Sequence, residues 1–187
     1  MIPIRNKKKT LQVTVEEMRN FAFSYVEKYA PSKQQLKTYL LKKYLKISAL
    51  KVKKQDVVNL IDIVLSDLEK NRFINDKFYS DSKAKSMIQR GNSINKIRSY
   101  LIGKVINNDL IKNTVDKINN ENSDQDFFSA IKICKKKKIG PARAEDNRPL
   151  FYKKDISLLA RNGFDFETSK KVMDLDKNDY LKIIRLL

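Results

Sequence analysis

The stretch SKQQLKTYL, residues 32–40, recurs 61 positions later as SINKIRSYL, residues 93–101. Both copies read S-x-x-x-[LI]-[KR]-[ST]-Y-L, so they share a serine, two apolar positions, and the basic, hydroxyl and tyrosine positions between them. Serine is a preferred helix N-cap, and apolar residues four positions apart lie on one helical face. A capped helix with this spacing arises by chance in many helical proteins, but the additional matches favour an internal duplication.

The sequence around both copies has the composition of a helical protein. Only 4 Gly and 4 Pro occur in 187 residues, and apolar residues recur at spacings of three and four, as they do in amphipathic helices. Helices are predicted at about 15–29 and 57–71 on either side of the first copy, and at about 76–90 and 108–118 on either side of the second. We therefore predict an all-α fold of tandem three-helix repeats, each resembling a helix-turn-helix, stacked into an elongated curved body.

The predicted division of the chain has a short tail and three repeats. The segments are a basic tail at 1–13 and repeats at 14–74, 75–120 and 121–187. The third repeat contains a long loop at 135–149, which we expect to be mobile, and a last helix that starts at Asp176 or Asn178. The predicted core includes Cys134; in their own helices, Phe78, Leu150 and Phe166 are also placed inward.

The composition excludes several classes of site. The sequence has no His and a single Cys, Cys134, which excludes an intramolecular disulfide, a Cys/His zinc site and a Ser-His-Asp triad. Too few glycines are present for a phosphate-binding glycine-rich loop. No apolar run reaches the length of a membrane span, and no apolar segment follows the basic N-terminal residues. We expect a cytoplasmic protein with no membrane segment and no cofactor.

The net charge of +18 is concentrated in three stretches without acidic residues. Nine lysines and no acid lie between Glu27 and Asp56, and six basic residues and no acid lie between Asp81 and Asp109. A third such stretch lies between Asp126 and Glu145. If the repeats stack in register, these stretches form one basic surface.

Two interpretations of this charge are open. A lysine-rich face can simply be solvated, in a chain of biased composition, but composition does not explain the missing acids. Binding to a polyanion explains both, and we favour sequence-independent contact with nucleic acid phosphates, with strong salt dependence. Tyr39, Tyr100, Phe78 and Phe164 have core spacing and are expected to be packed rather than available for base stacking.

Four stretches of the chain resemble the RecX family of bacterial recombination regulators. The family's D-x-x-[FY] turn, its basic helix ending in R-G-x-[SG] and its I-R-x-x-L-x-x-K-G-I helix are similar to residues 73–79 and 91–106. Its Y-L-L-R-R-L and L-x-R-R-G-F motifs are similar to residues 39–45 and 159–164. The resemblance covers about residues 17–174, with Val105 at a frequent glycine position and Asn162 at a basic one.

This resemblance implies a regulator without enzymatic activity. Its partners would be the RecA protein and single-stranded DNA within the RecA filament, in whose groove it would limit RecA assembly and activity during DNA repair and the SOS response. We expect it to act as a monomer. The residues that we expect to face DNA or the filament are basic and lie mostly on the second helices: Lys37, Lys42, Lys43, Arg90, Lys96, Arg98, Lys104 and Arg161.

Two other functions are alternatives to a RecA regulator. A sequence-independent helix-turn-helix protein would bind duplex DNA through a recognition helix. A nuclease would use Asp62, Asp67 and Glu69 to bind a metal ion, but their spacing on a helix does not bring them to one face, so exposed ion pairing is the better explanation. Arg90 and Arg161 have a simpler role open to them as well, because an arginine near a helix C-terminus complements the helix dipole.

Overall fold

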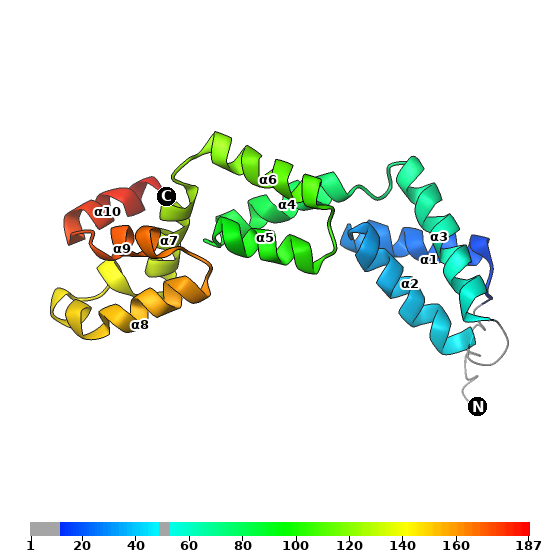
Figure 1. Cartoon of the computed structure of the whole chain (residues 1–187), viewed down its shortest axis with the longest axis horizontal. Helices are drawn as coiled ribbons and strands as arrows, with labels where there is room; N and C mark the ends of the chain where they lie inside the picture. The colour runs from blue at the N-terminus through cyan, green and yellow to red at the C-terminus, as the bar shows by residue number, and fades with distance from the viewer. Residues whose placement is uncertain (1–11, 49–52) are drawn as a thin grey trace, which may run out of the picture. The chain divides into compact units, whose positions relative to one another are not determined.

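The structure, a computed structural model, describes residues 12–48 and 53–187, and within these ranges it contains helices and no strands (Figure 1). The α-helices are α1 Val15–Tyr29, α2 Lys33–Ser48, α3 Lys54–Lys70, α4 Asp76–Gln89, α5 Ile94–Gly103, α6 Asn108–Glu121, α7 Gln125–Lys137, α8 Arg148–Arg161, α9 Phe166–Met173 and α10 Lys177–Leu186. Two 3-10 helices, η1 Gly140–Ala142 and η2 Glu145–Asn147, lie between α7 and α8. The predicted all-α class is confirmed. Nearly all of the predicted basic tail lies outside the described residues.

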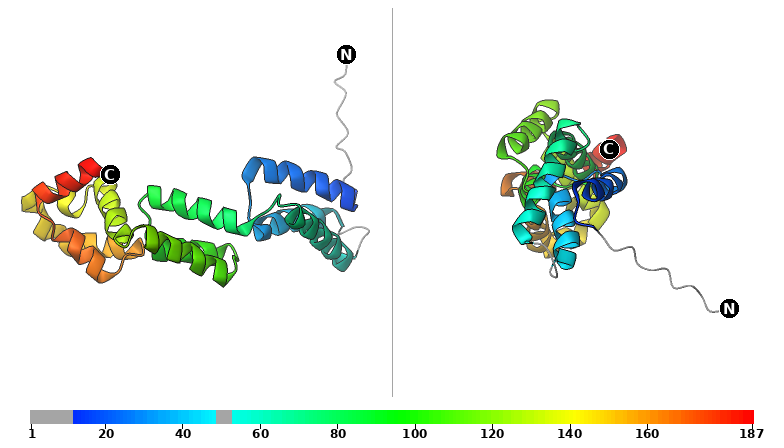
Figure 2. Two further views of the ribbon diagram at one scale, coloured as in Figure 1. Left: turned by 90° about the horizontal axis from the view of Figure 1, so that it is seen from above. Right: turned by 90° about the vertical axis from the view of Figure 1, so that its right-hand side faces the viewer.

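The chain divides into two compact units, residues 1–76 and 77–187. In the first unit α3 packs against both α1 and α2, as the blue and cyan helices of Figure 2 show. Its core is a single apolar cluster in which Met18 of α1, Leu36 of α2 and Ile61 of α3 are fully buried. This cluster lies within the range predicted for the first repeat.

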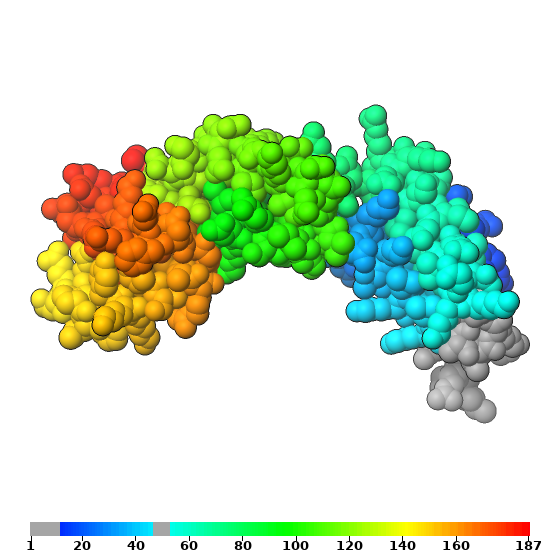
Figure 3. All heavy atoms as spheres, in the orientation of Figure 1, coloured from blue at the N-terminus to red at the C-terminus, as the bar shows by residue number. Residues whose placement is uncertain are grey.

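The second unit contains two apolar clusters, one for each of the remaining predicted repeats. One is formed by α4–α6 around Ile97 and Leu101, and the other by α7–α10 around Ile131 and Leu159. The surface of this unit is continuous from α5, green in Figure 3, to the orange segment around residue 165. Cys134 is fully buried in the second cluster, and burial raises the pKa of its thiol to about 12.

Side-chain caps start most of these helices, as the sequence predicts. Gln35 N–H donates to Ser32 Oγ at 3.2 Å, and Ser32 N–H donates to the Gln35 side chain at 3.1 Å, which completes a capping box for α2. Ser93 caps α5 in the same way, by accepting from Lys96 N–H at 3.1 Å. Asp165 and Asp176 cap α9 and α10. The duplicated serines therefore have the same structural role.

The inward placement of Phe78, Leu150 and Phe166 is wrong. Phe78 and Leu150 are 67% and 78% exposed, and Phe166 is exposed as well. Phe78 lies two residues before Ser80, which is fully buried, and two residues correspond to about 200° around a helix, so Phe78 faces outward. Leu150 likewise lies two residues before the half-buried Tyr152 and so faces outward. Phe166 is the first residue of α9 and lies beyond the edge of the core.

The loop predicted at 135–149 is shorter than expected. Helix α7 continues to Lys137, α8 begins at Arg148, and two 3-10 helices fill most of the interval between them. Gly140 and Pro141 are buried. A run of four lysines followed by Gly-Pro suggests a loop, but the packing of Ile139 and its neighbours into the core of α7–α10 fixes this connection.

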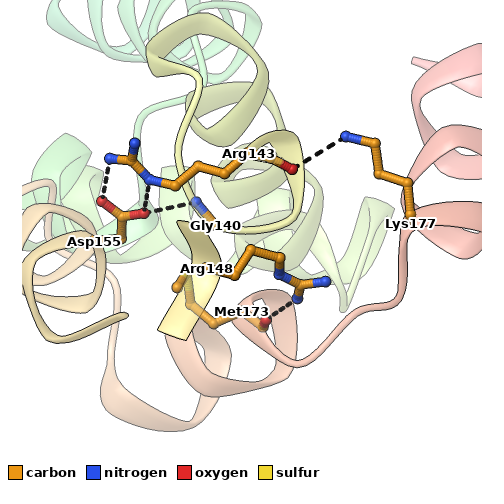
Figure 4. Close-up of polar contacts among 6 residues, drawn as sticks. All are labelled: Gly140, Arg143, Arg148, Asp155, Met173 and Lys177. Carbon is orange, nitrogen blue, oxygen red and sulfur yellow. Dashed lines mark hydrogen bonds and ion pairs between the residues drawn. The ribbon is translucent and has the colours of Figure 1, made fainter. Parts of the chain in front are cut away.

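A buried carboxylate holds this connection in place (Figure 4). Asp155 of α8 is 1% exposed and accepts from Gly140 N–H at 2.9 Å. Its two oxygens also accept from the Arg143 guanidinium at 2.7 and 2.9 Å. Burial raises the pKa of the Asp155 carboxyl, but the hydrogen bonds from Arg143 and Gly140 lower it by more, so that the pKa lies below its ordinary value.

We predict that Asp155→Asn lowers the free energy of unfolding by about 3 kcal/mol, because it leaves the Arg143 charge without its partner. The measurement is urea unfolding followed by circular dichroism, with the exposed Asp146→Asn of η2 as the control. A depressed carboxyl pKa stabilises the fold above the pKa of the unfolded chain, about 4, and this contribution is lost as the pH falls through the folded-state value. The difference between wild type and Asp155→Asn should therefore shrink in acid, and equal stability of the two at pH 7 would contradict this role.

The end of α5 has an unfavourable backbone conformation. Val105 has φ +57°, in the left-handed region, and its side chain is 66% exposed. Ile106 N–H donates to Leu101 O at 3.2 Å, which is the hydrogen bond of a Schellman-type helix end, where glycine is preferred. Val105 is also the position at which the resembled family often has glycine. A β-branched residue in this conformation is strained.

We predict that Val105→Gly raises the free energy of unfolding by about 1 kcal/mol, because glycine adopts positive φ without the steric cost of a Cβ atom. Thermal or urea unfolding measures this change. Val105→Ala is the matched control, since it shortens the side chain but keeps the Cβ atom. An equal stabilisation by both variants would show that side-chain size, and not backbone conformation, causes the effect.

Candidate nucleic-acid interface

Helix α5 carries the second copy of the duplicated stretch, and its buried residues decide which side chains face solvent. Ile97 and Leu101 are fully buried. Arg98 and Ser99 directly follow Ile97 and are exposed. Among the residues that the structure describes, Arg98 has no ion-pair partner. Its full charge is therefore available to an anionic partner.

Lys96 and Lys104 of the same segment are half-buried. Lys96 Nζ donates to Asn162 Oδ1 at 3.0 Å, a neutral acceptor that leaves the lysine charge uncompensated. Lys104 is the C-cap residue of α5, and its Nζ lies 5.3 Å from the ring centroid of Tyr100. Lys96 thus has a structural contact in addition to the role predicted for it, whereas Arg98 has none.

The N-terminus of α5 meets the end of α8. Ser93 Oγ donates to the carbonyl oxygen of Asn162 at 2.8 Å, so Lys96 and Arg161, the last residue of α8, lie at the same junction. Arg90 precedes Gly91, and Gly91 packs closely against Ser129 and Lys132 of α7. Arg90, Lys96 and Arg161 therefore lie near the start of α5, whereas Lys104 lies at its end.

One carboxylate at this junction is used for structure. Asp126 of α7 accepts from Ile94 N–H at 2.8 Å. Burial raises the pKa of this carboxyl, the hydrogen bond from Ile94 lowers it, and the nearby charge of Asp165 raises it, with a net increase. Asp126 satisfies a free N–H at the start of α5 and forms no ion pair with the basic residues beside it in the described part of the chain.

The remaining predicted contact residues lie on α2 in the first unit. Lys37 Nζ forms an ion pair with Asp62 Oδ1 at 2.6 Å, whereas Lys42 is exposed. Lys43 is half-buried, and its Nζ lies 3.3 Å from the ring centroid of Phe21. Lys42 and Lys43 form no ion pair with the described residues, so two of the three contact residues predicted on α2 carry uncompensated charges.

Three of the four acidic residues of α3 form ion pairs. Besides the pair of Asp62 with Lys37, Asp67 Oδ2 lies 3.0 Å from Arg19 Nε, and Glu69 Oε2 lies 2.6 Å from Lys33 Nζ. In the described ranges no three Asp, Glu or Cys side chains come together as a metal site would require. These contacts agree with the ion-pairing explanation of the α3 acids.

An aromatic cluster on α1 and α2 was missed by the sequence analysis. The rings of Tyr25 and Tyr39 stack with centroids 4.0 Å apart and an interplanar angle of 15°, and the Tyr29 ring lies 4.8 Å from that of Tyr25. Tyr39 was placed in the core from its spacing, but it is only half-buried. The signal that could have indicated this cluster is the i, i+4 spacing of Phe21, Tyr25 and Tyr29 along one side of α1.

The comparisons with known proteins give a clear relative. The Regulatory protein RecX of Myxococcus xanthus is 30% identical over 177 residues, which cover 91% of this chain and 91% of the relative. The chain belongs to the RecX family. A crystal structure of regulatory protein RecX matches 86% of this chain and 74% of its own, with a TM-score of 0.60 and 18% identity, so the two share a fold. No protein-family model matches the sequence.

The RecX relationship agrees with the sequence resemblance. Both proteins found in the comparisons are named as regulatory proteins. None of the helices in the described residues is long and apolar enough to cross a membrane. A RecX-type regulator is therefore the function class of this chain.

This RecX-family chain has a tight contact at the junction of α5 and α8. Gly163 has φ +87°, and a Cβ atom at this position would collide with Ser93 Oγ and lie 3.2 Å from Lys96 N. We predict that Gly163→Ala lowers the free energy of unfolding by about 2 kcal/mol, from backbone strain and from this collision. Urea unfolding and amide exchange at the start of α5 measure the change.

A double-mutant cycle separates the two causes. Ser93→Ala alone should cost about 1 kcal/mol through loss of the cap. In the Gly163→Ala background, Ser93→Ala also removes the collision, so the double variant should be more stable than the sum of the single effects requires. Additive effects would place the cost of Gly163→Ala in the backbone alone.

Proposed function

We propose that this RecX-family chain binds the RecA filament on single-stranded DNA and limits RecA assembly and ATP hydrolysis. The observation that carries the proposal is the exposed Arg98 on α5, which shares its segment with Lys96 and Lys104 and, in the described structure, has no acidic partner. A nucleoprotein filament offers both DNA phosphates and acidic protein surface to such charges. In this proposal the protein acts as a monomer in the cytoplasm.

In this proposal the protein acts by binding to the filament and not by catalysing a reaction. Basic side chains that neutralise phosphates release bound counterions, which gives affinity without sequence preference. Because α2 and α5 each carry such residues, one chain would contact the filament at more than one place, and linked contacts bind more tightly than either alone. A protein bound along the filament would block the addition or the movement of RecA subunits.

The test is RecA ATP hydrolysis on single-stranded DNA, titrated with this protein. The double variant Lys42→Glu/Arg98→Glu should raise the concentration for half-inhibition by about tenfold or more, since both charges are uncompensated. We avoid Lys96 because its hydrogen bond to Asn162 makes it part of the fold. The matched control is Lys70→Glu/Lys112→Glu, which makes the same charge change at two exposed lysines of α3 and α6.

Three outcomes decide the proposal. Inhibition by wild type and by the control, but weak inhibition by the Lys42→Glu/Arg98→Glu variant, supports it. Absence of inhibition by wild type at equimolar RecA would overturn it. Tight binding to duplex DNA without any effect on RecA would instead favour the alternative of a sequence-independent helix-turn-helix DNA-binding protein.

A further inference from the structure

The surface residues shared by the two duplicated stretches have no explanation in the core. The capping serines and the two apolar positions match because they are fully buried in both copies. Four other positions match in chemical type but are exposed or half-buried: Lys37 and Arg98, Thr38 and Ser99, Tyr39 and Tyr100, and, just beyond the quoted stretch, Lys43 and Lys104. Packing against a core does not require a tyrosine followed four residues later by a lysine at these positions.

In the first unit this Tyr–Lys pair is held between α1 and α2. Lys43 Nζ lies 5.6 Å from the ring centroid of Tyr39 and 3.4 Å from its hydroxyl oxygen. The ring of Tyr25 stacks on Tyr39, and the Phe21 ring lies under the lysine ammonium. Two aromatic rings of α1 therefore fix the positions of both members of the pair.

In the second unit the corresponding pair has a similar arrangement. Lys104 Nζ lies 5.3 Å from the ring centroid of Tyr100. The hydroxyl of Tyr100 is hydrogen bonded to that of Tyr79 of α4 at 3.1 Å, and Tyr79 is buried. Each tyrosine is thus fixed by a tyrosine from the preceding helix. Neither Lys43 nor Lys104 has an ion-pair partner in the described parts of the chain.

We propose that the pairs Tyr39–Lys43 and Tyr100–Lys104 each bind one nucleotide of single-stranded DNA, with the tyrosine ring stacked on the base and the lysine ammonium against the phosphate. The proposal rests on the proposed function, because it names the DNA chemistry that the second helices contact. An aromatic ring beside a cation is the combination that binds single strands without sequence preference. In a duplex the faces of the bases are stacked inside, so the tyrosines add affinity only for unpaired DNA.

The first test uses wild-type protein and two single-stranded oligonucleotides of equal length, one of thymidine and one of abasic deoxyribose phosphates. Both carry the same phosphate charge, so phosphate contact alone gives equal affinity. We expect the abasic strand to bind about tenfold more weakly, because it has no bases to stack on the tyrosine rings. Equal affinity for the two strands would overturn the role of the tyrosines.

The second test separates the two members of the pair. Tyr100→Leu keeps an apolar side chain, and it should reduce the difference between thymidine and abasic strands without changing the dependence of affinity on salt. Lys104→Gln should keep that difference and lower the slope of log affinity against log salt by about 0.7, the value for one phosphate contact on a single strand. Tyr39→Leu and Lys43→Gln should behave in the same way.

The control is Tyr152→Leu on α8. Tyr152 is also a half-buried tyrosine of a second helix, but Ile156 occupies the position four residues later, so this variant should bind both strands as wild type does. Tyr100→Phe keeps the ring, so this variant should retain the preference for thymidine. Loss of the preference in this variant would show that the ring is not the contact. Circular dichroism checks that each variant is folded.

These assays contain no RecA, which separates this inference from the proposed function. Inhibition of RecA by a protein that does not distinguish thymidine from abasic strands would overturn the nucleotide pairs and leave the regulatory function standing. Base-dependent binding to single strands without any inhibition of RecA would support the nucleotide pairs and overturn the regulatory function. A protein that neither distinguishes the two strands nor inhibits RecA would overturn both the nucleotide pairs and the regulatory function.

Discussion

The structure depends on one kind of hydrogen bond, in which an aspartate binds the first free N–H of a second helix. Lys33 N–H donates to Asp76 Oδ1 at 2.8 Å in the first unit, and Ile94 N–H donates to Asp126 Oδ1 at 2.8 Å in the second. The first N–H groups of a helix have no acceptor within it, and an anionic acceptor is favoured at that end of the helix dipole. In both cases the aspartate lies in the first turn of a later helix, α4 for Asp76 and α7 for Asp126. The start of a second helix is therefore complete only when the following helix is in place.

The capping serines determine the exposed face as well as the helix start. Ser32 and Ser93 are fully buried, so the residues four and eight positions later turn into the core and the residues between them turn outward. The outward positions hold Arg98 and Lys37. The same local interaction that starts the helix thus sets which basic side chains can meet an anionic partner. An interface built in this way needs no separate loop or strand to position it.

The sequence predicted the features that depend on neighbouring residues. The caps at Ser32, Ser93 and Asp176 form as expected, because each bond joins a side chain to an N–H three residues later. Contacts between distant residues were not predictable from spacing. Asp155 has an ordinary place in a helical pattern, and only the fold brings Gly140 N–H and the Arg143 guanidinium to it.

The candidate site shows the same division between local and distant contacts. The basic positions could be identified from the acid-free stretches. Which of these side chains contact a partner elsewhere in the chain could not be identified in this way. Lys96 and Asn162 are 66 residues apart in the chain, and Lys37 and Asp62 are 25 apart, yet each pair is in contact. Exposed ion pairs contribute only about 0–1 kcal/mol, so the Asp62 contact of Lys37 competes weakly with a phosphate. The binding surface is therefore defined less by the number of lysines than by where the fold leaves them without carboxylates, and the net charge alone, +18, does not contain that information.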